Sequence, residues 1–323
     1  MSKIIYNRKN LPFVSFIIPT LNSEKYLNNC LSSIQKQTYP KEKYEVLVID
    51  GGSVDNTRNI ANKFSAKIID NPFIDPETAK SLGIQNSKGG IIALLDSDNE
   101  IVKKEWLEKM VKPLQENSEI FGVESQYFFK KGDSIFNKYC MLAHIADPFS
   151  RCLASKLEVQ KKGEYMEYFI KGKETYPLGS NGFLWNKKII KKVGNYKPKF
   201  EESNFSYFIL GKGFRKFARV PGYGIYHYHI SSLNDFIQKR LKIGNKFLNR
   251  KDEHKKTWLE GVSKIKFICC GIYCATFVGP LLEGLYNLFL TKQKAWLLHP
   301  IMSFLSVFTY GIVLLRRTIK FKK

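Results

Sequence analysis

The sequence predicts an α/β fold with a mostly parallel central sheet, followed by a C-terminal helical membrane hairpin. Apolar runs of strand length alternate with helical spacing from Phe13 to about Leu114, and short polar clusters follow three of these runs. Two long apolar runs near the C-terminal end predict the hairpin. We therefore expect one domain over residues 1–264 and a membrane anchor over residues 265–323, with helices at about 265–290 and 295–315.

Four apolar runs are expected to form strands, at residues 14–19, 44–50, 67–70 and 91–96. Each run is too apolar to have one face in water. This pattern is typical of strands in a parallel sheet that helices cover on both faces.

Helical segments separate these strands. Between the first two strands, four apolar residues recur at helical spacing behind the capping residues Asn22 and Ser23, namely Leu27, Cys30, Leu31 and Ile34. Residues 55–57 open a second, short helix. A third helix follows the fourth strand, and its apolar face consists of Trp106, Leu107, Met110, Val111 and Leu114.

The charge of the chain is strongly basic. It has 323 residues, with 52 Lys and Arg against 29 Asp and Glu, a net charge of +23. A hydrophobic share of 44% excludes a disordered basic tail, so we expect a folded protein with an anionic partner. The lysines are spread along the chain, which argues against a nucleic-acid-binding module and favours an anionic membrane surface.

The six cysteines suggest no disulfide framework. Three of them fall within an apolar run, the others are scattered, and no CxxC pair is present. We expect them to be reduced, as in a reducing compartment.

The two apolar runs are each long enough to cross a hydrocarbon core, which takes about 20 helical residues. Lysines and arginines flank the pair, which predicts that both ends and the domain of residues 1–264 are cytoplasmic. Lys292 and Lys294, in the connection between the runs, oppose this orientation. The alternative is that one or both runs are interfacial or buried helices, since four residues interrupt them: Pro280, Glu283, His299 and Pro300.

Polar residues follow three of the predicted strands, and the carboxyl ends of parallel strands form a common ligand-binding edge. Asp50 ends the second strand, where a carboxylate can accept hydrogen bonds from a nucleoside. Asp96 and Asp98 stand two residues apart after the fourth strand, where both can face one cavity and hold a hard divalent ion. The alternative is a loop with capping acids. The chain lacks GxxxxGK[ST] and GxGxxG, which makes a P-loop or Rossmann nucleotide site unlikely.

In order, the chain carries IIPTLNSEKYLNNCLSSIQKQTYP, EVLVIDGGSVDNT, AKSLGIQNSKGGIIALLDSDNE, LGSNGFLWNKKIIKKVGNYKPKFEESNF and VPGYGIYHYHISSLNDFIQKRLKIG. Together these motifs resemble the family 2 glycosyltransferases, which have the GT-A fold. The resemblance covers about residues 13–244. It implies an enzyme that transfers a sugar from a nucleotide-diphospho-sugar, with UDP or GDP as the nucleotide.

The resemblance also implies roles for particular residues. The DxD motif is Asp96-Ser97-Asp98, in which Asp98 is the expected ligand of Mg²⁺ or Mn²⁺ and Asp96 a second ligand or a ribose contact. His227, with His229 as an alternative, completes the metal or diphosphate contacts. Lys80 stands where the family often has arginine, and Arg240 where the family has a basic contact to the donor phosphates. The full set expected to bind substrate is Pro19, Thr20, Asn22, Glu24, Asp50, Gly51, Ser53, Lys80, Asp96, Ser97, Asn181, Gly182 and Arg240.

An inverting transfer needs a carboxylate that takes the proton of the acceptor hydroxyl. The family usually has a Glu-Asp pair at this point, and this chain has Glu201-Glu202. Glu202 is the expected base and Glu201 the alternative. An acceptor that is already an anionic lipid phosphate needs a base less.

These residues predict a metal-dependent, inverting glycosyltransferase with a lipid-linked acceptor at the cytoplasmic membrane face, acting in glycan assembly. The alternative within this class is a polyprenyl- or dolichyl-phosphate monosaccharide synthase. Alternatives of other classes are an inactive membrane scaffold and a basic nucleic-acid-binding protein. Assembly into a homo-oligomer is left open.

Overall fold

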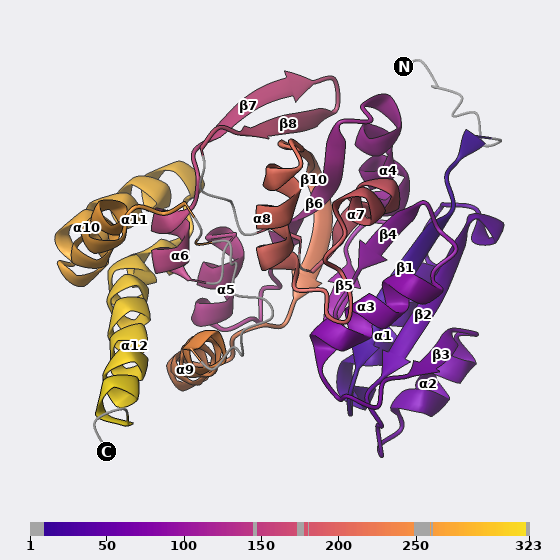
Figure 1. The fold of residues 1–323 in the computed structure, drawn as a ribbon, viewed down its shortest axis with the longest axis horizontal. Helices are drawn as coiled ribbons and strands as arrows, with labels where there is room; N and C mark the ends of the chain where they lie inside the picture. The colour runs from indigo at the N-terminus through magenta and orange to yellow at the C-terminus, as the bar shows by residue number, and fades with distance from the viewer. Residues whose placement is uncertain are drawn as a thin grey trace. The chain divides into compact units, whose positions relative to one another are not determined.

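The computed structural model describes residues 10–144, 147–172, 178–179, 181–248, 259 and 261–320 (Figure 1). The chain forms two compact units. The first comprises the chain up to Gln126, Leu157–Ile170 and Leu178–Ile225, and the second comprises Tyr127–Lys156, Lys171–Pro177 and Tyr226–Lys323. The division into a domain of residues 1–264 and an anchor of residues 265–323 stays a prediction.

The first unit is built on one mixed sheet, which confirms the predicted α/β class. The expected parallel pairing is found among the four strands between residues 14 and 94, whereas the strands at residues 157–162, 165–170 and 183–186 pair antiparallel with their neighbours. The sheet order is β3-β2-β1-β4-β9-β6-β10-β8-β7, with β5 beside β10, and β1 pairs in parallel with both β2 and β4. The strands are β1 (Val14–Thr20), β2 (Tyr44–Asp50), β3 (Lys67–Asp70), β4 (Ile91–Leu94), β5 (Asn99–Ile101), β6 (Ile120–Phe128), β7 (Leu157–Lys162), β8 (Tyr165–Ile170), β9 (Phe183–Asn186) and β10 (Lys216–His227).

The predicted second and third strands match β2 and β3, and the predicted first strand is one residue shorter than β1. The predicted fourth strand is two residues too long. β4 ends at Leu94, because the side chain of Asn99 accepts a hydrogen bond from the backbone N–H of Asp96 and the chain turns there.

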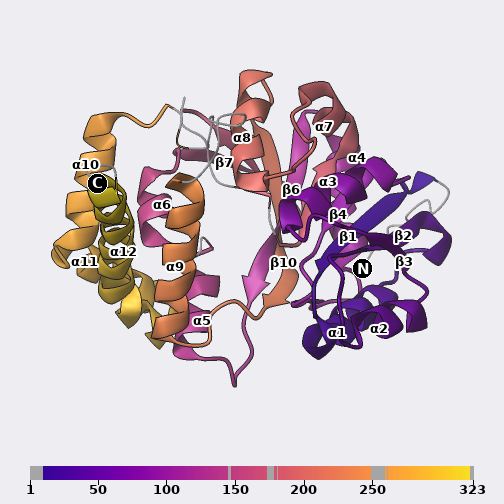
Figure 2. The ribbon, with the colours of Figure 1, turned by 60° about the horizontal axis from the view of Figure 1, so that its bottom comes forward.

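The helices of the first unit are α1 (Glu24–Gln35), α2 (Thr57–Lys63), α3 (Pro76–Asn86), α4 (Trp106–Glu116), α7 (Lys187–Val193) and α8 (Glu202–Gly211), and a 3₁₀ turn, η2 (Lys41–Lys43), precedes β2. Figure 2 shows α1 and α2 on one side of β1, β2 and β3, and α3 on the other. Right-handed crossovers require this arrangement when the strand order reverses at β1. The predicted apolar face of α1 is buried as expected.

A chain of buried hydrogen bonds joins α4, β6 and the turn before β9. The Trp106 indole N–H donates to Ser125 Oγ at 3.0 Å, and the Ser125 hydroxyl donates to the Gly182 carbonyl at 2.7 Å. Trp106 and Ser125 are both buried. These two hydrogen bonds therefore fix the Gly182 turn to the core of the sheet.

The second unit is largely helical. It contains α5 (Ile135–Leu142), α6 (Pro148–Leu153), α9 (Leu233–Leu248), α10 (Lys264–Ala275), α11 (Val278–Thr291), the 3₁₀ turn η4 (Lys294–Leu298) and α12 (His299–Lys320). One apolar cluster centres on Tyr139 and Trp296, and a second on Phe149 and Cys274.

The first C-terminal apolar run differs from the expected single helix over residues 265–290. α10 and α11 form a pair bent by 73°, and Phe277 between them has a left-handed φ of 62°. Pro280 explains the break, because in a continuous helix it would clash with the carbonyl of Thr276 and leave that carbonyl without a donor. Within the described residues, one helix, Lys294–Arg316, is long and apolar enough to cross a membrane, or two if the bent pair is one span.

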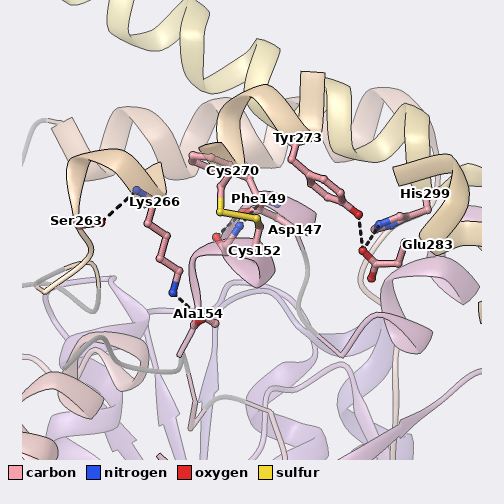
Figure 3. The surroundings of a disulfide bond; sticks show 11 residues. Asp147, Phe149, Cys152, Ala154, Ser263, Lys266, Cys270, Tyr273, Glu283 and His299 are labelled. Atoms are coloured by element: carbon pink, nitrogen blue, oxygen red, sulfur yellow. Dashed lines mark hydrogen bonds and ion pairs between the residues drawn. A yellow bond between two sulfur atoms is a disulfide. The ribbon is translucent and has the colours of Figure 1, made fainter. Parts of the chain in front are cut away.

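A disulfide bond corrects the expectation that all cysteines are reduced. Cys152 of α6 is bonded to Cys270 of α10, with 5.8 Å between their Cα atoms (Figure 3). The two residues are 118 positions apart, and the packing of α6 on α10 brings them together. The free cysteines are Cys30, Cys140, Cys269 and Cys274.

We predict that Ser125→Ala lowers the free energy of unfolding by about 1–3 kcal/mol, because it leaves the Trp106 N–H and the Gly182 carbonyl without their buried partner. Urea-induced unfolding followed by tryptophan fluorescence measures this change. The matched control is Ser118→Ala at an exposed serine, expected to stay within about 0.5 kcal/mol. Equal stability of the two variants would contradict the prediction.

Candidate active site

Asp50, at the end of β2, is buried within a ring of hydrogen-bond donors. Its carboxylate accepts from Ser53 Oγ at 2.6 Å, from Thr20 Oγ1 at 3.2 Å and from Arg58 Nη1 at 3.0 Å. Burial alone would raise the pKa of Asp50, but the hydrogen bonds from Ser53 and Arg58 outweigh it and hold this pKa below its usual value. Asp50 is therefore an anion fixed at the carboxyl edge of the sheet.

The loops after β1 and β2 are joined by reciprocal hydrogen bonds. The Asn22 N–H donates to Ser53 Oγ, and Asn22 Oδ1 accepts from the Val54 N–H at 3.0 Å. Glu24 Oε2 likewise accepts from the Asn56 N–H at 3.0 Å. Asn22 and Glu24 therefore hold the two loops together in the structure, in addition to the substrate contacts that the sequence predicts for them.

Gly51 lies between the same strand ends. Its N–H donates to the Thr20 carbonyl at 2.8 Å, and a Cβ at this position would lie 3.4 Å from that oxygen. Pro19 and Thr20 are the last two residues of β1. Five predicted donor residues, Pro19, Thr20, Asp50, Gly51 and Ser53, thus gather at the ends of β1 and β2.

Asp96 and Asp98 lie in the turn that follows β4. Both are half-buried, and a carboxylate oxygen of each lies within 4.8 Å of one from the other. Asn99 orders this turn, because its amide donates to Asp98 Oδ1 at 3.1 Å while its oxygen accepts from the Asp96 N–H. Ser97 Oγ donates to Ser23 Oγ at 3.0 Å, which joins the turn to the loop after β1.

The charges of this turn act on the buried Cys30 of α1. Burial raises the pKa of the Cys30 thiol, and the nearby carboxylates of Asp98, Asp96 and Glu100 raise it further. Three carboxylates in the turn after β4 and in β5 thus contribute to one negative potential. An oxygen-rich, anionic donor set of this kind suits a hard divalent ion such as Mg²⁺ or Mn²⁺.

A buried ion pair joins Lys80 of α3 to Glu202 at the start of α8. Their residues are only 9% and 7% exposed. Burial raises the pKa of Glu202, Lys80 lowers it without cancelling that effect, and Asp96 adds to the rise. Despite burial, Glu202 and Asp96 raise the pKa of Lys80. Lys80 therefore interacts with the expected base and with one expected metal ligand.

Glu201, the alternative base, precedes α8 and is half-buried. Its carboxylate accepts a hydrogen bond from the Asn204 amide. The Phe200 N–H just before it donates to the Glu77 carbonyl of α3 at 2.9 Å, which fixes the start of α8 against α3.

Gly182 is placed beside β4 in a conformation that favours glycine. Its φ is 74°, its N–H donates to the Leu94 carbonyl at 2.7 Å, and a Cβ would lie 2.8 Å from Ser125 Oγ. Asn181 precedes it and is half-buried. Ser180, in the same predicted loop, lies outside the described residues.

His227 and Arg240 belong to the second unit. His227 ends β10 and is buried, with its ring centroid 4.9 Å from that of His229. Arg240 of α9 is 3% exposed, and its Nη1 lies 3.5 Å from Asp147 Oδ2. Burial, His227, Lys239 and Arg240 lower the pKa of His229 to about 2, so this ring is neutral.

Three residues have clear roles in the structure that were not predicted from the sequence. Arg58 binds both Asp50 and Asp70, the latter at 2.6 Å, and so bridges the ends of β2 and β3. Asn99 orders the Asp96–Asp98 turn, and Asp147 pairs with Arg240. The position of Asn99 directly after Asp98 was an available signal, whereas the partners of Arg58 and Asp147 depend on the fold.

Comparisons with known proteins agree with this geometry. The family model described as glycosyl transferase family 2 matches residues 15–194. The glycosyltransferase AglE of Haloferax volcanii is 36% identical over 136 residues, which cover 40% of this chain and 44% of that protein. The match therefore spans less than half of this relative.

A second relative aligns over nearly its whole length. It is the dolichyl N-acetyl-alpha-D-glucosaminyl phosphate 3-beta-D-2,3-diacetamido-2,3-dideoxy-beta-D-glucuronosyltransferase of Methanococcus voltae, 24% identical over 93% of this chain and 95% of that protein. Among solved structures, the mannosyltransferase PcManGT of Pyrobaculum calidifontis, in complex with GDP-Man and Mn²⁺, superposes with a TM-score of 0.55. The superposition covers 94% of this chain and 87% of that one at 14% identity, and supports the GT-A fold.

The matched region covers more than half of the chain and includes the strand ends that carry Asp50, Asp96 and Asp98. The predicted fold and family are thereby confirmed, and the protein belongs to glycosyl transferase family 2.

Proposed function

We propose that the protein transfers a sugar, with inversion, from a nucleotide-diphospho-sugar to a lipid-linked acceptor at the cytoplasmic face of a membrane. One observation carries the proposal: Asp50 follows β2, and Asp96 and Asp98 follow β4, the two strands that flank β1, so the three acids stand at one edge of the sheet. Asp96 also influences the buried Lys80–Glu202 pair. The acids suit a sugar nucleotide with its metal ion, and the pair supplies a carboxylate for proton transfer.

The donor is held by the residues at the ends of β1, β2 and β4. Asp50 accepts hydrogen bonds from the base or the ribose, while Thr20, Gly51 and Ser53 line the same edge. Lys80 offers positive charge to the diphosphate, since a lysine is a point charge without the two-pronged geometry of arginine. The other residues proposed to bind the donor are Pro19, Asn22, Glu24, Ser97, Asn181, Gly182 and Arg240.

Asp96 and Asp98, with His227 as a third proposed ligand, would hold Mg²⁺ or Mn²⁺. Such an ion neutralises the charge that develops on the departing nucleoside diphosphate. The choice between UDP and GDP, and between the two ions, is open. PcManGT, whose complex contains GDP-Man and Mn²⁺, is an example with the same fold.

Glu202 is the proposed base that takes the proton of the acceptor hydroxyl. Its burial favours the neutral form, so that proton uptake is favourable once the acceptor attacks. Lys80 favours the ionised form of the carboxylate before that step. The loss of charge on Glu202 would in turn release Lys80 to interact more strongly with anionic oxygens.

A lipid-linked acceptor is supported by the apolar C-terminal helices and by the Methanococcus voltae relative, whose name specifies a dolichyl-phosphate-linked substrate. The basic charge of +23 suits an anionic membrane surface. A second candidate is a polyprenyl- or dolichyl-phosphate monosaccharide synthase, in which the acceptor is the lipid phosphate itself.

We predict that Asp98→Asn lowers sugar transfer by at least about 100-fold, because it removes one charged ligand of the metal ion while keeping the shape of the side chain. Transfer is measured with a panel of UDP- and GDP-sugars, and donor binding by the protection that each gives with Mn²⁺ against thermal unfolding.

The control for this variant is Glu42→Gln, which removes an exposed carboxylate from η2. It is expected to retain wild-type transfer and protection. Full transfer by Asp98→Asn would overturn the metal site, and the absence of transfer and protection in the wild type would favour an inactive scaffold.

We predict that Glu202→Gln lowers kcat by about 10²–10⁴-fold with little change in donor KM, whereas Glu202→Asp retains part of the activity. Glu201→Gln is the matched variant next to it and is expected to remain active. The reverse result would assign the base to Glu201. Full activity of both Gln variants would exclude a base and favour the lipid-phosphate acceptor.

A further inference from the structure

The outer faces of α10 and α11 are apolar and exposed. Ile265 is 76% exposed on α10, and Val278, Leu282 and Phe289 are 65%, 64% and 70% exposed on α11. The other large apolar residues exposed on these helices are Phe267, Ile268, Ile272, Leu281, Leu285, Tyr286 and Leu290. So many exposed large apolar side chains on two successive helices are rare on a soluble monomer and indicate an interaction site.

Neither helix is long enough to span a bilayer. α10 has 12 residues and α11 has 14, which correspond to about 18 Å and 21 Å at the rise of an α-helix, against a hydrocarbon core of roughly 30 Å. The bend of 73° at Phe277 prevents the two from acting as one straight span. This geometry fits helices that lie within one leaflet.

The single charged residue between Lys266 and Lys292 is Glu283, and its partners hold it against the protein. Glu283 accepts a hydrogen bond from Tyr273 Oη at 2.6 Å, and it lies 3.0 Å from Arg151 Nη2 and 3.3 Å from His299 Nε2. Figure 3 shows Tyr273 and His299 both reaching Glu283. The carboxylate is thus compensated within the second unit and need not enter lipid.

The inner faces of the same helices are fixed. Cys270 and Cys274 are the buried residues of α10, and the disulfide joins Cys270 to Cys152 of α6. Gly284 of α11 packs so closely that a Cβ would lie 2.7 Å from the Trp296 carbonyl. One face of α10 and α11 therefore packs against the rest of the second unit, and the opposite, exposed face is left for another partner.

The lysines at the two ends indicate which partner this is. Lys264 and Lys266 stand at the start of α10, and Lys292 and Lys294 follow α11. In a spanning hairpin the second pair would lie on the outer side, against the positive-inside tendency. If both helices stay in one leaflet, all four lysines lie on the same side, where anionic headgroups attract them.

We propose that α10 and α11 form an interfacial elbow, which buries its exposed apolar face in one leaflet of an anionic bilayer and returns to the side from which it entered. This inference refines the membrane attachment in the proposed function and rests on it. The elbow would hold the second unit on the membrane surface without a transmembrane crossing by residues 264–291.

Thiol labelling in sealed vesicles of anionic lipid, with an impermeant maleimide applied from one side, tests the elbow. On a Cys269→Ser background, Lys264→Cys and Thr291→Cys report the two ends, and Val278→Cys reports the apolar face. Val159→Cys is the matched control, because Val159 is an exposed valine on β7. A lipid-soluble maleimide verifies that each thiol is present.

We expect both end positions to react from the same side, and Val278→Cys to react at least 10-fold more slowly than Val159→Cys. Reaction of the two ends from opposite sides would make the segment a span and overturn the elbow. Equal rates at the two valine positions would exclude burial in lipid.

Slow labelling of Val278→Cys that persists in detergent, and that disappears when the protein is diluted, would instead assign the apolar surface to a second copy of the chain. Protection of the same protein by a sugar nucleotide with Mn²⁺ reports the donor site independently. A failed elbow with intact protection is therefore distinguishable from a failed glycosyltransferase.

Discussion

The reversal of strand order at β1 is the constraint on which the candidate active site depends. β1 pairs in parallel with β2 on one side and β4 on the other, so their carboxyl ends meet at one edge while the helices that follow them diverge. Two backbone hydrogen bonds secure this edge, from Gly51 to Thr20 and from Gly182 to Leu94. Acids that are distant in sequence can act on one ligand only because the sheet has this order.

Burial then determines the electrostatics of the edge. Lys80 and Glu202 are buried and act strongly on each other, and the nearby charge of Asp96 raises the pKa of both. Such a pair is costly to desolvate, and it offers no clear gain in stability over an apolar contact. In the proposed function its value lies in reactivity, since the charge of one member depends on the protonation of the other. A site with an excess of carboxylates also favours the arrival of a cation.

Features that depend on local composition could be predicted from the sequence. The bounds of β2 and β3, the buried face of α1 and the acids at the strand ends follow from apolar periodicity and from the behaviour of parallel sheets. The Lys80–Glu202 contact spans 122 residues, and the Cys152–Cys270 bond spans 118. Both depend on how helices pack, which periodicity does not specify. Arg58 was missed for the same reason, because its partners lie on two different strands.

With α10 and α11 as the proposed elbow, the C-terminal helices illustrate how hydropathy alone can overestimate the number of membrane spans. A window average treats Glu283 and His299 as isolated charges in an apolar run, whereas the structure places them against Arg151, Tyr273 and Tyr139. The same residues that make a transmembrane path costly make packing against the protein favourable, because each polar group has a partner there. Pro280 adds a backbone constraint in the same direction. An apolar run with compensated charges and a proline is thus better suited to a helix with one face on protein and one in lipid.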